Sequence, residues 1–245
     1  GENTARNSYY ANNYTPHLLI DGNVDGGSNT GVWGTQINNE IQVTSPLDIQ
    51  LSGSLNYSTK LGNIDIVIIA TSSISYTNLK MRLAITESNI HWHAPNGSTD
   101  HHQTFRDMVP NTNGVSFTIA QGDTVIFHEP INLRSPMVLA NCSIVVFVQS
   151  DNGKRILQGA KIGVPSLQRI YELAPFSLVS PRNDSTLNTC FPICTWRRSS
   201  DPDSGYAINY EVQLSLDPEF TTPLVSDPLS DSTWTCPNCL VNDTL

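Results

Sequence analysis

The chain has 245 residues, 38% of them hydrophobic and only 14% charged, and its formal net charge is −9. Because this charge repels the phosphates of nucleic acids and anionic membrane surfaces, we expect neither as a partner. No apolar stretch approaches the roughly 18 residues of a membrane-spanning helix, so we also expect no membrane span.

Alternation of apolar and polar residues, interrupted by turn residues, dominates the chain and predicts a mainly β fold, an antiparallel β-sandwich. One helix is expected, near Asn29–Glu40, after a glycine-rich turn. Turn signals such as Asp21-Gly22 and Asn113-Gly114 separate the predicted strands. In chain order these strands are Leu18–Asp21, Asp48–Tyr57, Asp65–Ser73, Lys80–Ser88, Ser116–Ala120, Val125–Glu129, Ser143–Ser150 and Ile156–Ile162.

A second module is predicted to begin near residue 174, where the pattern restarts after the segment Leu173–Phe176. In this module we expect Trp196 to be buried and Tyr210–Ser215 to form a strand, because its apolar residues alternate. The module would hold about 70 residues, which is short for a seven-strand sandwich of roughly 100.

The segment Asn13–Gly22 resembles the part of the thioredoxin fold in which a cis-proline precedes a core strand and a tight turn. The resemblance implies a cis peptide bond before Pro16 and a thioredoxin-fold remnant over residues 1–42. Thioredoxin chemistry needs a Cys-x-x-Cys pair before that proline, and no cysteine precedes Cys142. We therefore expect the thioredoxin-like segment to have a structural role and no thiol-redox activity.

Three later segments, Lys80–Glu87, His101–Arg106 and Ile144–Gly159, resemble the Omp-twenty-eight-related outer-membrane protein family. The resemblance implies a bacterial protein of the extracellular space or outer cell surface, with a β-sandwich over residues 43–173 behind the thioredoxin-like segment. Residues 174–245 resemble the front of a fibronectin type III-like module. The sequence thus matches only the tail of one fold and an incomplete second sandwich.

Four histidines, His91, His93, His101 and His102, are candidate ligands of zinc or another transition metal. His91 and His93 would lie on one face of a strand, since side chains alternate along it. The alternative is a polar loop between strands with no metal.

Two acidic turns are candidate calcium sites, because calcium prefers oxygen ligands. The first holds Asp21, Asn23 and Asp25 but has Val32 where a calcium loop closes with glutamate; the second holds Asp201 and Asp203. The alternative for both is a plain turn. We expect no cofactor beyond these two metals.

Four cysteines, Cys190, Cys194, Cys236 and Cys239, are predicted to be oxidised, because an extracellular module favours disulfides over zinc. In the fibronectin-like arrangement the two segments would lie on neighbouring strands, with at least one bridge between them. Cys142 alternates in phase with Ile144 and is expected to be a buried free thiol.

No set of residues with catalytic spacing occurs, so we expect no enzyme. The leading hypothesis is a secreted or cell-surface structural or adhesive protein, a subunit of an extracellular assembly or filament that self-associates through strand addition. One alternative is a carbohydrate- or peptide-binding accessory module with aromatic platform residues; another is the remnant of a thiol-redox protein. The candidate platform residues are Tyr9, Tyr10, Trp33, Trp92 and Trp234.

Overall fold

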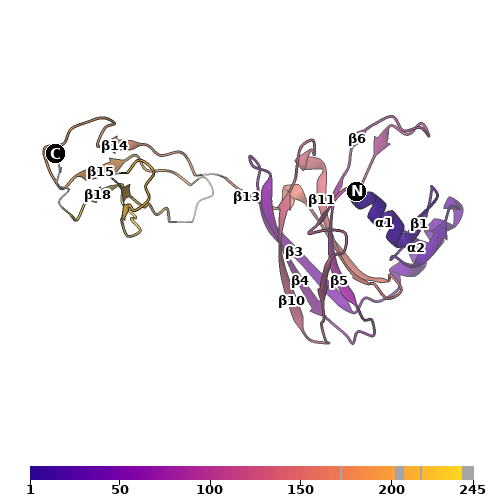
Figure 1. Ribbon diagram of the computed structural model, residues 1–245. Coiled ribbons are helices and arrows are strands. Elements are labelled where there is room, and N and C mark those ends of the chain that lie inside the picture. Colours follow the sequence, from indigo (N-terminus) through magenta and orange to yellow (C-terminus); the bar gives the residue numbers. More distant parts are fainter. Residues whose placement is uncertain (172, 202–206, 216, 239–245) are drawn as a thin grey trace. The chain divides into compact units, whose positions relative to one another are not determined.

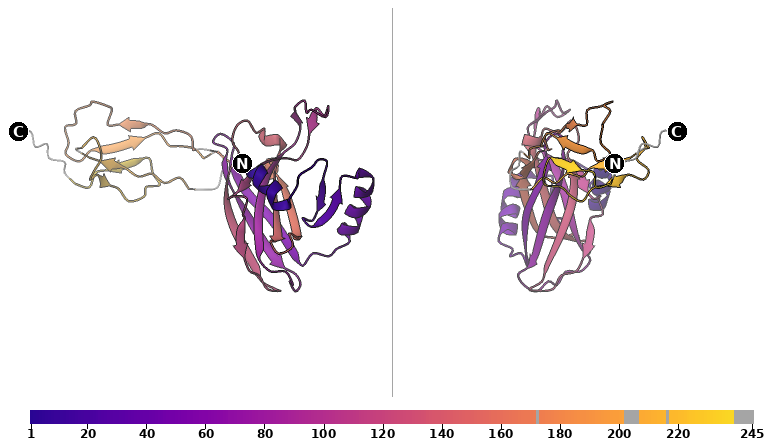
Figure 2. Two further views of the ribbon diagram at one scale, coloured as in Figure 1. Left: turned by 45° about the vertical axis from the view of Figure 1, so that its right-hand side comes forward. Right: turned by 90° about the vertical axis from the view of Figure 1, so that its left-hand side faces the viewer.

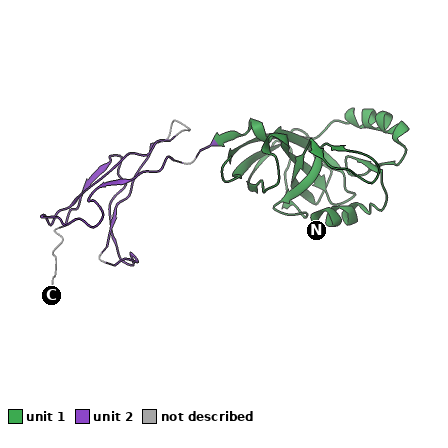
Figure 3. Cartoon of the chain, turned by 90° about the horizontal axis from the view of Figure 1, so that it is seen from above, with its two compact units in different colours: residues 1–169 green, residues 170–245 purple. Residues whose placement is uncertain are grey.

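The structure is a computed structural model that describes residues 1–171, 173–201, 207–215 and 217–238. The chain forms two compact units, Gly1–Arg169 and Ile170–Leu245 (Figures 1 and 3). The predicted boundary near residue 174 lies a few residues after this division, which falls inside strand β13 (Gln168–Ile170).

Unit 1 is an antiparallel β-sandwich, as the sequence predicted. One sheet has the order β10-β4-β3-β13, and the other has the order β12-β11-β5-β8 with β9 also pairing with β5. In both views of Figure 2 the two helices lie outside the strands of the sandwich. The strands are β3 (Leu47–Asn56), β4 (Leu61–Ala70), β5 (Leu79–Glu87), β8 (Thr104–Val109), β9 (Val115–Phe117), β10 (Thr124–Asn132), β11 (Cys142–Ser150) and β12 (Ile156–Gly163).

One hydrophobic core fills the space between the two sheets. From Ile64 to Ala70 of β4, every second residue is buried, because successive side chains of a strand point to opposite faces of the sheet. The opposing sheet contributes residues with the same alternation. The fully buried members of these central strands are Ile64, Ile66, Ile68, Met81, Leu83, Ile85, Ile144, Val146 and Val148.

The N-terminal segment belongs to the same compact unit as the sandwich and is not a separate domain ending at residue 42. It consists of helix α1 (Glu2–Tyr10), the hairpin β1 (Leu18–Ile20) and β2 (Val24–Gly27), and helix α2 (Thr30–Ile41). The Asn29 side chain accepts a hydrogen bond from the Gly31 N–H and caps α2 where the sequence predicted a helix. The Thr15–Pro16 bond is cis, as expected.

Short elements connect the strands of unit 1. A two-stranded hairpin, β6 (Ile90–His91) and β7 (Asp100–His101), projects between β5 and β8. Two single-turn 3-10 helices, η1 (Leu139–Asn141) and η2 (Val164–Ser166), flank β11 and β12. The described residues include no helix with the length and apolar character that crossing a bilayer requires.

Unit 2 has far less regular structure. A three-stranded sheet, β14-β15-β18, comprises Leu178–Ser180, Ile193–Trp196 and Thr233–Thr235. The predicted strand Tyr210–Ser215 is reduced to the two residues of β16 (Gln213–Leu214), paired with β17 (Leu224–Val225), and an isolated bridge at Tyr210. A small core of Cys194, Trp196 and Tyr210 is buried.

Candidate functional site

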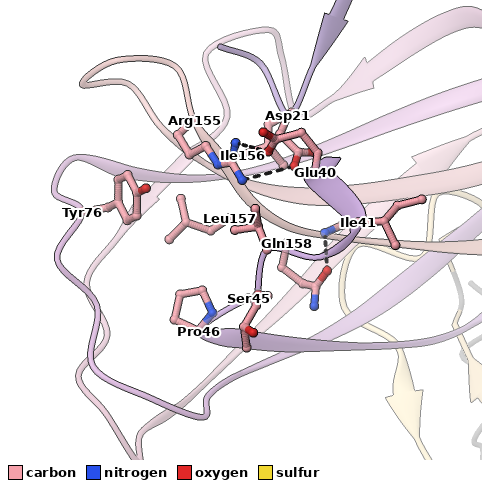
Figure 4. Close-up of a pocket in the computed structure, with 13 residues that line it drawn as sticks. Asp21, Glu40, Ile41, Ser45, Pro46, Tyr76, Arg155, Ile156, Leu157 and Gln158 are labelled. Carbon is pink, nitrogen blue, oxygen red and sulfur yellow. Dashed lines mark hydrogen bonds and ion pairs between the residues drawn. The ribbon is translucent and has the colours of Figure 1, made fainter. Parts of the chain in front are cut away.

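One cavity of unit 1 lies where the segment between α2 and β3 passes the start of β12. It measures about 340 Å³. At one end Arg155 lies between two carboxylates, with Nη1 2.6 Å from Glu40 Oε2 and Nη2 3.4 Å from Asp21 Oδ2 (Figure 4). Tyr76 and Leu157 form an apolar part of its wall. The cavity thus combines an apolar surface with a charged end.

The charged groups at that end are already paired with one another, two carboxylates with one guanidinium. Arg155 is largely buried, and burial raises the pKa of Asp21 while the Arg155 charge opposes that rise. The Ser45 hydroxyl donates to the Leu47 carbonyl and accepts from the Leu47 N–H, so both of its hydrogen bonds are to backbone groups. The arrangement can hold α2 against the sandwich and accept an apolar group.

The predicted calcium ligands of the first acidic turn do not converge. Asp21 faces Arg155, and the Asn23 side-chain oxygen accepts from Arg155 Nη1 at 3.4 Å. Asp25 instead accepts from the Gly27 N–H at 2.7 Å and lies 2.9 Å from His17 Nε2. The bonds from His17 and Gly27 lower the pKa of Asp25. In the structure the two carboxylates of this turn have protein partners, and the calcium site stays a prediction.

The second predicted acidic site lies only partly within the described structure. Asp201 is described and is partly buried, whereas Asp203 lies outside the described residues.

Two of the predicted histidine ligands have partners within the β6–β7 hairpin itself. His91 Nδ1 is 2.8 Å from Asp100 Oδ1, whereas His101 Nε2 lies 2.9 Å from the Trp92 carbonyl oxygen. His93 and His102 are exposed. Within the described ranges no three His, Cys, Asp or Glu side chains are grouped to hold a metal. The four histidines lie in or just after the strands of the β6–β7 hairpin, and their role as metal ligands stays a prediction.

The cysteine prediction is only partly matched. Cys190 is disulfide-bonded, Cys194 and Cys236 are free buried thiols, and Cys239 lies outside the described residues. Cys194 pairs across the sheet with Trp234, so Cys236 is its diagonal neighbour. Diagonal neighbours lie about 7–8 Å apart, beyond the usual Cα separation of a disulfide. The Cys236 thiol instead donates to the Asn238 carbonyl at 3.2 Å.

We expect Cys142 to react very slowly with alkylating reagents in the folded protein. Its thiol is buried and donates to the Val138 carbonyl; burial, followed by the Glu87 carboxylate, raises its pKa to about 11. At pH 8 about 0.1% of such a thiol is thiolate, against roughly a quarter at an ordinary pKa of 8.5. Mass spectrometry after timed alkylation should show at least a roughly 100-fold slower reaction of Cys142 than in denatured protein. Comparable rates in the two states would contradict this assignment.

The candidate aromatic platform is also divided among different parts of the fold. Trp33 Nε1 donates to the Gly26 carbonyl at 3.0 Å, and Trp234 packs against the core of unit 2. Trp92 is exposed and lies beside the His101 ring. Tyr9 and Tyr10 form an edge-to-face pair on α1. The four rings of unit 1 thus come from three different segments of that unit.

A cluster of charged and aromatic residues under α1 was not predicted. Arg82 lies on the outer face of β5, is only 2% exposed, and donates to Asp151 Oδ1 at 2.8 Å. Tyr9 donates to the same oxygen at 2.8 Å, and Arg6 lies over the Tyr9 ring at 4.3 Å. One signal in the sequence could have indicated it: Lys80 and Arg82 alternate with apolar residues, which is typical of the strand face away from the core.

Burial shapes the ionisation of this cluster. It raises the pKa of Tyr9, and the hydrogen bond to Asp151 raises it further. It also lowers the pKa of Arg6, with an additional contribution from the charge of Arg82. Tyr9 therefore stays neutral and acts as a hydrogen-bond donor.

These features define a two-sheet β-sandwich protein whose N-terminal helices pack beside the sandwich and which has a second, smaller unit. The family model described as outer membrane protein Omp28 matches residues 3–166, more than half of the chain. The chain belongs to this family. Family membership places it at the outer surface of a bacterial cell, in agreement with the expected location.

Two solved structures from Porphyromonas gingivalis are similar to the chain. HBP35 has 10% sequence identity and a TM-score of 0.49, and the alignment covers 84% of this chain and 63% of HBP35. A domain of the outer membrane lipoprotein Omp28 has 12% identity and a TM-score of 0.37, with 51% of this chain and 98% of that domain covered. No curated protein matches the chain in sequence. The family assignment rests on the family match.

Proposed function

We propose that the protein is a non-catalytic structural or adhesive component of the cell surface that self-associates by strand addition at β14 of unit 2. The observation that carries this proposal is the composition of this edge strand. Leu178 is 60% exposed and Val179 is also exposed, and β14 has no charged residue. Among the described strands of this sheet, only β15 pairs with β14, so its outer edge offers unpaired backbone groups.

The edges of the sandwich differ from β14 in a way that supports the proposal. Four outer strands of its two sheets each carry a charge or a proline, the residues by which proteins prevent edge-to-edge pairing, whereas the three-residue β9 carries neither. The residues concerned are His128, Glu129 and Pro130 on β10, Arg169 on β13, Lys161 on β12, and Arg106 and Asp107 on β8.

Sedimentation velocity on the purified chain in the micromolar range tests the proposal. We expect concentration-dependent association that Leu178→Lys weakens about tenfold or more, because a lysine on the edge opposes pairing with another strand.

Ile126→Lys on β10 is the matched control, since Ile126 is likewise an edge-strand residue and is 55% exposed. It should leave association unchanged. A chain that remains monomeric throughout this range, or an equal effect of the two variants, would overturn assembly through β14.

A further inference from the structure

A second cavity of unit 1 lies between α1 and the outer face of β5. It measures about 280 Å³. Arg6 and Tyr9 of α1, Lys80 and Arg82 of β5, and Asp151 after β11 contribute to its lining. These groups come from three separate segments of one compact unit, so the fold itself assembles the cavity.

The charge of this lining is opposite to that of the whole chain. Three cationic side chains face one carboxylate, although the chain carries 22 acidic and 13 basic residues. Only Arg82 has an ion pair with that carboxylate, Asp151. Arg6 donates to three neutral groups, the Tyr10 hydroxyl at 3.0 Å, the Gln149 side-chain oxygen at 3.1 Å and the Thr112 carbonyl at 3.5 Å. The cavity therefore holds an excess of positive charge.

Lys80 and Arg82 retain capacity for an anionic partner. Lys80 Nζ is 2.5 Å from the Ser116 hydroxyl oxygen, a neutral acceptor, and an ammonium has three donor hydrogens. Arg82 Nε and Nη1 are buried and have no hydrogen-bond partner among the described residues. Burying a cation with incomplete hydrogen bonding is costly, and an anion beside it would offset that cost.

Aromatic contacts hold the two arginines in place. The Tyr9 ring has Arg6 Cζ at 4.3 Å and Arg82 Cζ at 5.2 Å from its centroid. The Tyr9 hydroxyl is bound to Asp151, as is Arg82 Nη2. Guanidinium groups fixed in this way lose little further freedom when they bind an oxyanion.

We propose that this cavity binds a small dianionic oxyanion, a phosphate or dicarboxylate group carried by a soluble ligand. Arg6, Lys80 and Arg82 supply the positive charge, and an oxyanion offers several acceptors for their donors. The charges set the class of ligand: two positive charges remain after Asp151 balances one, which matches a dianion.

Calorimetric titration of the purified chain with inorganic phosphate and, separately, with malonate tests the proposal, with sodium chloride at equal ionic strength as the reference. We expect saturable binding of at least one dianion. Binding of phosphate alone identifies a phosphate group as the ligand chemistry, and binding of malonate alone identifies a dicarboxylate.

The decisive variant is Lys80→Gln, because Arg82 is buried and its replacement risks unfolding. We expect this change to weaken dianion binding about tenfold or more, since it removes one of the three charges. Lys161→Gln on β12, an exposed lysine outside the lining of the cavity, should leave binding unchanged. No saturable binding beyond that of chloride, or an equal loss in both variants, would overturn the proposal.

Discussion

Replacing Trp196 with alanine is expected to unfold unit 2 while unit 1 remains folded. Trp196 is 6% exposed, and its ring packs edge-to-face on Tyr210 with centroids 5.4 Å apart. Buried tryptophan-to-alanine changes cost about 3–5 kcal/mol. A core as small as that of unit 2 rarely supplies more than about 3–5 kcal/mol of net stability. The stability lost in Trp196→Ala is therefore comparable to the entire stability of unit 2.

Hydrogen–deuterium exchange read by mass spectrometry separates the two units. The amides of β15 should exchange at the rate of an unfolded chain in Trp196→Ala, while those of β4 and β11 stay protected. Trp196→Phe should destabilise unit 2 less than Trp196→Ala does. It keeps an aromatic ring, and the indole N–H that it removes has no partner among the described residues. Trp92→Ala, at a 59% exposed tryptophan of unit 1, is the control and should change neither unit. Continued protection of β15 in Trp196→Ala would contradict this account.

The sandwich could be predicted because its strands are long and have two different faces. Along β4 and β11 one face is buried in the core, which imposes the alternation that the sequence displays. The boundaries were less accurate: β4 begins at Leu61, four residues before the predicted start at Asp65. Gly62 and Asn63 carry no apolar alternation, and β3 holds them in the sheet through backbone pairing.

Helix α1 could not be predicted, because its stability is not local. Its sequence is polar and none of its residues is fully buried. Short helices of this kind form in proteins mainly through tertiary contacts. Here Arg6 and Tyr9 supply those contacts by bonding to Gln149 and Asp151, more than a hundred residues away in the chain.

The candidate sites, like α1, depend on contacts with distant residues that a local sequence pattern does not reveal. Asp21 and Asp25 have the spacing of calcium ligands, yet one faces Arg155 and the other His17. Spacing fixes which residues are near in sequence, whereas the direction of each side chain depends on what packs beside it. The alternation of Lys80 and Arg82 with apolar residues indicates the outer face of their strand, but nothing in the sequence indicates that α1 covers that face.

Replacing Asp151 with alanine is expected to destabilise unit 1 by about 3 kcal/mol or more, because it leaves a buried arginine without its carboxylate. The Asp151 side chain is 22% exposed and accepts hydrogen bonds from both Arg82 and Tyr9. Urea unfolding, followed by the protection of unit 1 amides, measures the loss. Asp100→Ala is the control. It removes the exposed partner of His91, whose side chain is 81% exposed, and should cost less than about 1 kcal/mol.

A double-mutant cycle separates the charge effect from lost packing. Arg82→Met in the Asp151→Ala background removes the unpaired cation while keeping much of the side-chain volume. It should recover a large part of the stability, because an apolar pair can replace a buried ion pair at little cost. Two outcomes would contradict the idea that Asp151 compensates the buried charge of Arg82. One is that Asp151→Ala lowers the stability of unit 1 no more than Asp100→Ala does. The other is that adding Arg82→Met lowers this stability further instead of restoring it. The excess positive charge under α1 would then need a different explanation.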